Sequence, residues 1–336
     1  MHSLRHHALF LFLFFLISCG LGYPALKRYD PRRIDGLSDT ALYYQLVVGN
    51  PRNLVRENMR GRLLVPFVAK PIYWVARNRL KSIDPALFGL LLANSFFCSL
   101  TATLLVSVGL RIVANQATAL LGATLYLLSF AISNFYVAAM VDSSEACLMV
   151  ALTWLLLSNR WRWLPLLGVV GAVAKETFLP LGAMFALGWL FMENERKIIS
   201  WTKLGWVLIF ALADSFGLTV IYSILARQLV WPWQVAADVH TQANFAWAFL
   251  KPFVTPGFWY FFAWLLPFGV WRLRALPRPW LAAAAMGTAA ALLMSAWRDA
   301  GANAARPIFN VVGPMLSLSV AILIARTSET KLQSEA

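Results

Sequence analysis

The sequence predicts an all-α, polytopic membrane protein with about ten transmembrane helices, and three observations lead to this fold class. Hydrophobic residues make up 60% of the chain, charged residues only 13%, and the mean hydropathy is +0.65. This composition excludes a water-soluble domain. Apolar runs recur along the whole chain, and a helix of about 20 apolar residues spans the hydrocarbon core of a bilayer. We therefore expect a single transmembrane domain over residues 1–336.

Ten apolar runs are the predicted spans. Five of them are long enough to cross a membrane on their own: residues 86–110, 117–140, 204–226, 280–297 and 308–325. The other five are shorter and individually ambiguous: residues 8–22, 146–158, 164–174, 178–192 and 258–271. Alanine and glycine are frequent in several runs, as close packing of helices in lipid favours.

The first apolar run has two interpretations. Arg5 and two histidines precede it and Cys19 lies near its end, which is also the pattern of a lipoprotein signal with an acylated cysteine. The nine further runs make a lipid anchor unnecessary, so we interpret residues 8–22 as the first span. Cys98 and Cys147 are interpreted as small core residues. Three scattered cysteines give no disulfide or metal pattern.

Residues 23–85 form a polar loop after the first span, and Asp39 is its most informative residue. A helix is expected to begin at Thr40, which places Tyr43 one turn further on. Two roles are open for Asp39. It is either only a helix cap or a general base that is held at the membrane surface among arginines.

The loops contain three further predicted elements. Residues 50–61 have the cap, proline and terminal glycine of a short helix with arginines along one face. Residues 63–76 are apolar but include Lys70, and we expect them to lie in the membrane interface. A second outer loop, residues 227–257, contains several tryptophans that are either interface anchors or ligand contacts.

The basic residues predict the orientation in the membrane. With the N-terminus inside and ten spans, twelve Lys and Arg residues fall in cytoplasmic segments and five in short outer loops. This distribution satisfies the positive-inside rule and places both termini in the cytoplasm. We expect a multi-pass protein of the bacterial cytoplasmic (inner) membrane. The remaining twelve of the 29 basic residues lie in the extracytoplasmic loop 23–85. An anionic ligand would explain this excess.

Several charged residues lie close to the predicted spans. Asp142 and Glu145 are expected in a tight outer turn, where they are solvated, hold a cation or contact sugar hydroxyls. Lys175 and Glu176 lie between two apolar runs with almost no loop around them, so they either cap a turn or line a cavity. Asp214 is the most isolated charge, and it is either a proton-relay carboxylate or a packed acid with a polar partner.

Five features of the chain occur in a recognisable order. They are Asp39 with Tyr43, the segment Arg62-Leu63-Leu64-Val65-Pro66, Asp142, the glycine-rich run that ends in Lys175-Glu176-Thr177, and Arg306 with Pro314 around the last span. This ordered set resembles the GT-C superfamily of multispan glycosyltransferases, which includes aminoarabinose transferases and protein O-mannosyltransferases. The resemblance covers roughly residues 1–325.

The resemblance implies inverting transfer of a sugar from a polyprenyl-phosphate donor to a glycan, lipid or protein acceptor outside the cytoplasm. Asp39, or Asp35 as the alternative, would deprotonate the acceptor hydroxyl. The leaving lipid phosphate needs cations, and Arg62, Lys175 and Arg306 are the candidates. The substrate-binding residues implied are Tyr43, Arg62, Asp142, Glu145, Lys175, Glu176 and Arg306.

The implied site has to assemble from several loops. Asp35, Asp39, Asp142, Lys175, Glu176 and Arg306 are therefore expected to converge on one outward-facing cavity. Thr40 follows Asp39 where better-known members of the superfamily have a second acid. The resemblance thus implies no particular cofactor and leaves a divalent cation as an open alternative. Membrane lipids are expected partners, and nucleic acid is not.

Two other classes of function remain as alternatives. In a transporter or flippase, Asp214 and the Lys175–Glu176 pair would be charges near the membrane midplane, but the chain has no evident internal repeat of the kind that transporters often show. The third class is a non-catalytic membrane subunit of a polysaccharide assembly complex.

Overall fold

The computed structural model describes residues 2–24, 26, 39–49, 61–193, 200–237, 245–297 and 304–335. Within these ranges the regular secondary structure is helical and no strand occurs. The all-α fold class predicted from the composition is therefore confirmed. In the described part of the chain, four helices are long and apolar enough to cross a membrane, and shorter apolar helices accompany them.

Each of the ten predicted apolar runs contains helix. The helices are α1 (His2–Gly22), α5 (Pro85–Val113), α6 (Gln116–Leu127), α7 (Asp142–Leu157), α8 (Leu164–Ala174), α9 (Phe178–Glu193), α10 (Trp201–Ala226), α13 (Pro256–Phe262) with α14 (Leu265–Val270), α15 (Arg278–Trp297) and α16 (Ala305–Glu335). In the described stretches between these runs lie the helices α3 (Thr40–Val48), α4 (Leu64–Ala76), α11 (Pro232–Ala237) and α12 (Phe245–Val254). The four that reach spanning length are α5, α10, α15 and the part of α16 up to Thr327.

The predicted span 117–140 is not a single helix. The helix α6 ends at Leu127, and a π-helical turn, Ile132–Tyr136, follows it. In this turn Ser133 and Asn134 each donate a side-chain hydrogen bond to a backbone carbonyl four residues earlier. Side chains that bond to the local backbone compete with regular helix. The prediction of one continuous span was wrong here because hydropathy does not report such breaks.

The predicted span 258–271 and the loop before it also differ from expectation. The span is broken between α13 and α14 at Ala263, whose φ of 27° a continuous helix cannot accommodate. The loop 227–257 contains the helices α11 and α12. The short helix predicted at 50–61 lies outside the described residues, apart from Gly61.

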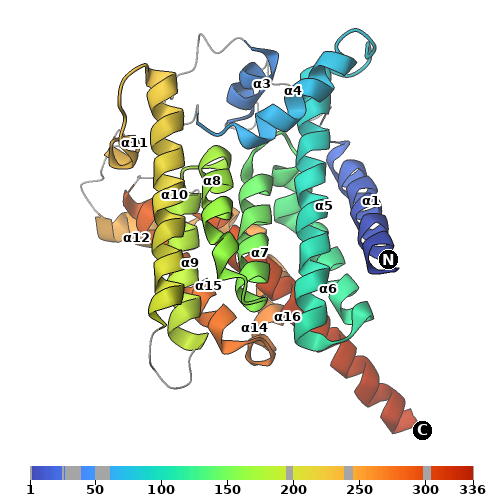
Figure 1. The fold of residues 1–336 in the computed structure, drawn as a ribbon. Helices are drawn as coiled ribbons and strands as arrows, with labels where there is room; N and C mark the ends of the chain where they lie inside the picture. Colours follow the sequence, from blue (N-terminus) through green and yellow to red (C-terminus); the bar gives the residue numbers. More distant parts are fainter. Residues whose placement is uncertain are drawn as a thin grey trace.

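The long helices stand side by side in a bundle, and α3 and α4 lie across one of its ends (Figure 1). Helix α4 approaches α5 closely, since a Cβ at Gly89 would lie 2.8 Å from the carbonyl oxygen of Ala69. Helix α8 approaches α10 in the same way, and a Cβ at Gly168 would lie 2.7 Å from the carbonyl oxygen of Phe210. Small residues permit such close contacts between helices in lipid. The bundle therefore holds the end of α8 and the start of α4 in fixed positions.

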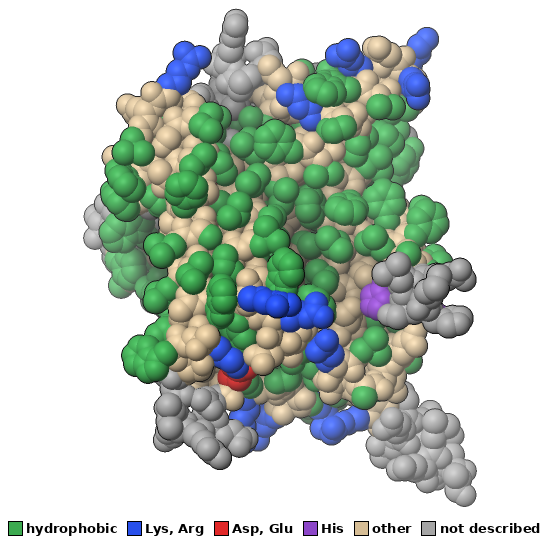
Figure 2. Space-filling view, in the orientation of Figure 1, with side chains coloured by type: hydrophobic (Ala, Val, Ile, Leu, Met, Phe, Trp, Pro, Cys, Tyr) green, Lys and Arg blue, Asp and Glu red, His purple; other side chains and the backbone are tan. Residues whose placement is uncertain are grey.

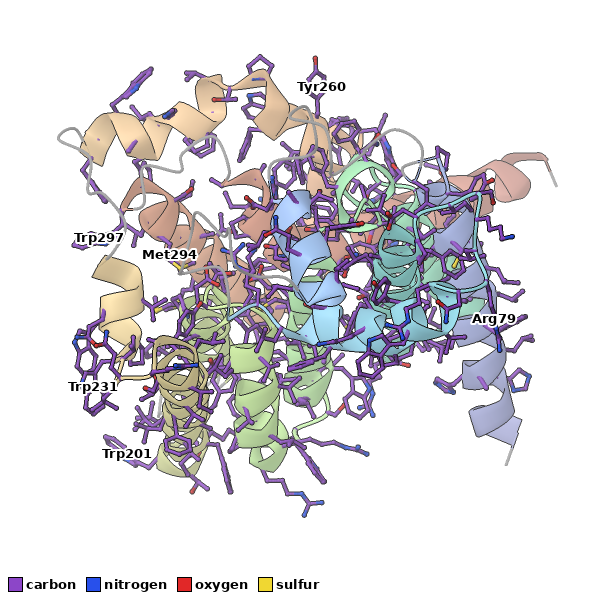
Figure 3. All side chains as sticks on the ribbon, turned by 90° about the horizontal axis from the view of Figure 1, so that it is seen from above. Arg79, Trp201, Trp231, Tyr260, Met294 and Trp297 are labelled. Carbon is purple, nitrogen blue, oxygen red and sulfur yellow. The ribbon has the colours of Figure 1, made fainter. Side chains whose placement is uncertain are left out.

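The surface of the bundle agrees with a multi-pass membrane protein. Hydrophobic side chains are spread over the face shown in Figure 2, and Lys and Arg lie mainly at its top and in its lower part. Viewed from the α3–α4 end, Trp201, Trp231, Tyr260 and Trp297 lie at the periphery (Figure 3), and all four are exposed. Aromatic side chains of this kind are enriched where a bilayer meets water.

Candidate active site

The residues predicted for the site lie at the ends of helices that meet beneath α3 and α4. Asp39 and Tyr43 come from the start of α3, Arg62 from the segment before α4, Asp142 and Glu145 from the start of α7, Lys175 and Glu176 from the link between α8 and α9, and Arg306 from the start of α16. Ion pairs and hydrogen bonds join these eight side chains in two adjoining networks, which we call the charge cluster. Asp35, the alternative base, lies outside the described residues.

Asp39 is the N-cap residue of α3 by position, and its backbone carbonyl accepts hydrogen bonds from Leu42 and Tyr43. Helix α3 begins at Thr40 as predicted, but the Asp39 side chain makes no capping hydrogen bond, so the interpretation of Asp39 as only a cap was wrong. Its Oδ2 atom lies 3.9 Å from Nη1 of Arg306, and the two side chains are 12% and 14% exposed. The side chains of Asp142 and Glu145 are 2% exposed or less. Asp39 and Arg306 therefore form the more accessible edge of the charge cluster.

Asp142 and Glu145 form the first turn of α7, and the prediction of a solvated turn was wrong. Carboxylates are favoured at a helix N-terminus by the helix dipole, and the apolar run that marked this span starts only after them. Both acids face Lys175, whose Nζ atom lies 2.6 Å from Asp142 Oδ1 and 2.9 Å from Glu145 Oε2. Lys175 is itself buried at the end of α8. The three side chains thus form a buried ion triad.

Glu145 is the most deeply buried acid of the triad and has two further partners. Thr177 donates its hydroxyl hydrogen bond to Oε1, and Asn310 donates from Nδ2 to Oε2 at 2.7 Å. The Tyr136 hydroxyl in turn donates to the amide oxygen of Asn310. The hydrogen bonds that link Tyr136, Thr177 and Asn310 to the charge cluster were not predicted from the sequence. Asn310 carried a signal, because it is a polar residue in an apolar span one helical turn after Arg306.

Arg62 and Glu176 form a buried, two-point ion pair. Nε of Arg62 lies 2.9 Å from Glu176 Oε2, and Nη2 lies 2.6 Å from Oε1. The third nitrogen, Nη1, donates to the Tyr43 hydroxyl at 2.9 Å. The backbone N–H of Leu63 donates to the carbonyl of Val173 at 2.9 Å, which fixes this segment against α8. Each nitrogen of the Arg62 guanidinium therefore already has a protein partner.

Burial and charge set the protonation of this pair. Burial lowers the pKa of Arg62, but Glu176 and Tyr43 raise it by more, so its pKa lies well above the usual value and the guanidinium stays charged. Burial raises the pKa of Tyr43 to about 12, and the charge of Arg62 opposes this rise. Tyr43 is therefore a neutral phenol near pH 7. Its hydroxyl accepts one hydrogen bond from Arg62 and can still donate one of its own.

Arg306 differs from the other two cations in its contacts. Its Nη1 atom lies 3.7 Å from Asp142 Oδ2 and 3.9 Å from Asp39 Oδ2, both longer than the contacts of Lys175 and Arg62. The ring of Phe135, from the π-helical turn, lies 5.7 Å from its Cζ atom, within range of a cation–π contact. Single turns of π-helix occur frequently at functional sites. Arg306 is therefore held between an aromatic ring and two carboxylates at the accessible edge.

Asp214 makes none of the hydrogen bonds or ion pairs of the charge cluster. Its side chain is buried between α10 and α8, and neither carboxylate oxygen has a hydrogen-bond partner in the described part of the chain. The alternative of a packed acid with a polar partner was therefore wrong within that part. Among the described residues, no group of three or more His, Cys, Asp or Glu side chains is placed to hold a metal ion.

No protein-family model and no curated protein sequence matches the chain. A solved structure does match: the crystal structure of ArnT from Cupriavidus metallidurans bound to undecaprenyl phosphate, with a TM-score of 0.62 over 91% of this chain. The fold is similar to that of ArnT.

The likeness to ArnT concerns the fold. The two sequences are 13% identical, and this chain covers 59% of the ArnT chain. At this level of identity, the roles of individual residues have to be argued from the geometry of the cluster itself.

Proposed function

We propose that this protein is an integral-membrane glycosyltransferase that moves a sugar from a polyprenyl-phosphate donor to an acceptor on the extracytoplasmic side of the membrane. Two facts support the reaction class: the fold is similar to that of ArnT, and that ArnT structure contains undecaprenyl phosphate. The donor in the present protein is inferred to be a lipid phosphate of the same chemical class. The acceptor is a glycan, lipid or protein hydroxyl.

One observation carries the assignment of the site. The carboxylate of Asp39 and the guanidinium of Arg306 lie 3.9 Å apart at the more accessible edge of an otherwise buried cluster. A transfer from a lipid phosphate requires these two chemical functions side by side, because it needs a base for the acceptor proton and a cation for the departing phosphate. An arginine suits the second function, since its guanidinium binds phosphate oxygens through paired hydrogen bonds.

The proposed reaction is a single displacement with inversion at the anomeric carbon. Asp39 takes the proton from the acceptor hydroxyl, and the acceptor oxygen forms a bond to the anomeric carbon. The bond from that carbon to the phosphate oxygen breaks, and its electron pair leaves with the lipid phosphate. Arg306 stabilises the negative charge that develops there. Every proton and electron pair is thus accounted for by the two substrates and Asp39.

The other members of the charge cluster are more deeply buried and contribute to this step indirectly. Arg62 is engaged by Glu176 and Tyr43, and Lys175 by Asp142 and Glu145. Their closest contacts are therefore to the protein, and we assign them a share in positive potential and in positioning, with Arg306 as the direct phosphate ligand. Tyr43 and Asp142 are buried and bonded to Arg62 and Lys175, so we assign them to the positioning of these cations. Asp142 also limits the approach of Arg306 to Asp39, because it attracts the same guanidinium nitrogen.

The test is the substitution Asp39→Asn in a strain that lacks the chromosomal gene. Asn keeps the shape of the side chain but cannot accept the proton of the acceptor, so the transfer rate should fall by about 10²–10⁴-fold. The readouts are transfer from a labelled polyprenyl-phosphate sugar in membranes and the surface glycan of the cells. Binding of the lipid donor and the melting temperature of the purified variant should stay close to those of the wild type.

Asp84→Asn is the matched control. Asp84 lies in the same loop, but it caps α5 by accepting hydrogen bonds from the N–H groups of Ala86 and Leu87 and accepts another from the Tyr44 hydroxyl. Asn caps a helix about as well as Asp, so Asp84→Asn should leave both stability and transfer close to the wild type. Asp35→Asn tests whether Asp35 is the general base instead of Asp39. If Asp39→Asn complements the deletion as well as the wild type does, Asp39 is not the base and the assignment fails.

A further inference from the structure

The charge cluster contains an arrangement that resembles a divalent-metal site with the metal replaced. Asp142 and Glu145 lie three residues apart on the first turn of α7, so their carboxylates are on one face of the helix. Such a pair is a common start of a Mg²⁺ or Mn²⁺ site, because hard cations prefer carboxylate oxygens. Here the Nζ atom of Lys175 lies between the two carboxylates, at 2.6 Å and 2.9 Å.

The groups around these carboxylates have the wrong polarity for a metal. Glu145 accepts hydrogen bonds from Lys175, Thr177 and Asn310, and therefore hydrogen atoms point at its oxygens where a metal site would offer further lone pairs. Asp142 is approached by Lys175 and, at 3.7 Å, by Arg306. A divalent cation here would be repelled by two protein cations. The residues present do not fit a divalent metal.

We propose that Lys175 is a built-in cation that takes the place of a divalent metal, so that the site works without one. This proposal deepens the proposed function, since it names the source of positive charge in the same site, but its main test is independent of sugar transfer. It also predicts a latent site: with the ammonium group removed, the two buried carboxylates are hard ligands that can receive a cation, and the Thr177 hydroxyl can rotate to offer its oxygen as a third.

The experiment compares full-length wild type with Lys175→Met, a side chain of similar length without charge, purified in detergent and freed of metal with a chelator. The melting temperature is measured with and without millimolar MgCl₂, MnCl₂ or CaCl₂, and bound Mn²⁺ is counted by electron paramagnetic resonance. The wild type should bind no Mn²⁺ at the cluster and keep its melting temperature. Lys175→Met should melt lower than the wild type, and at least one of the cations should raise its melting temperature by about 2–4 °C.

The double variant Lys175→Met/Glu145→Gln is the matched control, and it should lose the response to cations. The proposal is overturned if the wild type binds Mn²⁺ in a manner that Glu145→Gln abolishes, or if Lys175→Met responds to none of the three cations. If Lys175→Met fails to fold, Lys175→Gln replaces it. The Mn²⁺ measurement on the wild type also shows by itself whether the native cluster binds a metal. Loss of sugar transfer in Asp39→Asn and survival of transfer in a chelator are separate results, so the two proposals can fail independently.

Discussion

The carboxylate of Asp39, just before α3, lies 3.9 Å from the guanidinium of Arg306 at the start of the last helix. These two residues come from opposite ends of the chain, and the fold brings them together at the edge of a cluster whose remaining acids are almost fully buried. The contact gives Asp39 a partner other than the backbone of its own helix. The following predictions depend on this relationship and on the contacts behind it.

Arg306→Ala should weaken binding of the lipid donor. A hydrogen bond to a charged group is worth about 1.5–3 kcal/mol, so the dissociation constant for a polyprenyl phosphate should rise by about 10–100-fold. Arg306→Lys keeps the charge but not the paired geometry, and should lie between the wild type and the alanine variant. Donor binding by purified protein in nanodiscs is the measurement. Equal binding by Arg306→Ala and the wild type would exclude Arg306 as the phosphate ligand.

Removing one partner of the Arg62–Glu176 pair should destabilise the protein. Both side chains are less than 9% exposed, and the loss of one partner leaves a buried charge uncompensated, at a cost of about 3–5 kcal/mol. We expect Arg62→Met and Glu176→Gln each to lower the melting temperature clearly. The double variant should recover part of that loss. Additive losses in the double variant would show that the two side chains do not stabilise each other.

Asn310→Leu should reduce activity by displacing the groups to which Asn310 is bonded. The change removes a hydrogen bond to Glu145 and leaves the Tyr136 hydroxyl only the longer contact to the Arg306 carbonyl at 3.4 Å, a loss of about 1–3 kcal/mol. Asn310→Asp keeps the acceptor but sets a carboxylate against Glu145, and it should be at least as harmful. Thr153→Val on α7 is the control, because that hydroxyl bonds only to its own helix at Met149. Similar effects in all three variants would refute a positioning role.

The orientation in the membrane is tested by labelling single cysteines. Arg79 and Arg160 are both exposed, and we expect them on opposite sides of the membrane. In a background without native cysteines, Arg79→Cys should react with an impermeant thiol reagent in intact spheroplasts. Arg160→Cys should react only after permeabilisation. The reverse pattern would place the charge cluster on the cytoplasmic side and would rule out an extracytoplasmic acceptor.

Much of the site could be predicted from the sequence because charges in an apolar chain are conspicuous. Lys175 and Glu176 lie between two apolar runs, and Asp39 lies a turn before a tyrosine, so each was recognisable as a residue that needs an explanation. Asn310 was missed, since it carries no charge and its partners Tyr136 and Glu145 lie far away in the sequence. The breaks after Leu127 and at Ala263 were missed too, because hydropathy measures solubility in lipid and not backbone continuity.

The sequence by itself determined the fold class and the approximate position of each apolar helix, because burial in a bilayer is a property of local composition. Only the tertiary structure decided which charges become partners. Lys175 joins Asp142 and Glu145, Arg62 joins Glu176, and Arg306 lies between Asp39 and Asp142. These choices depend on how closely α8 packs on α10 and α4 on α5, and such distances are set by small residues on facing helices that no single stretch of the sequence contains.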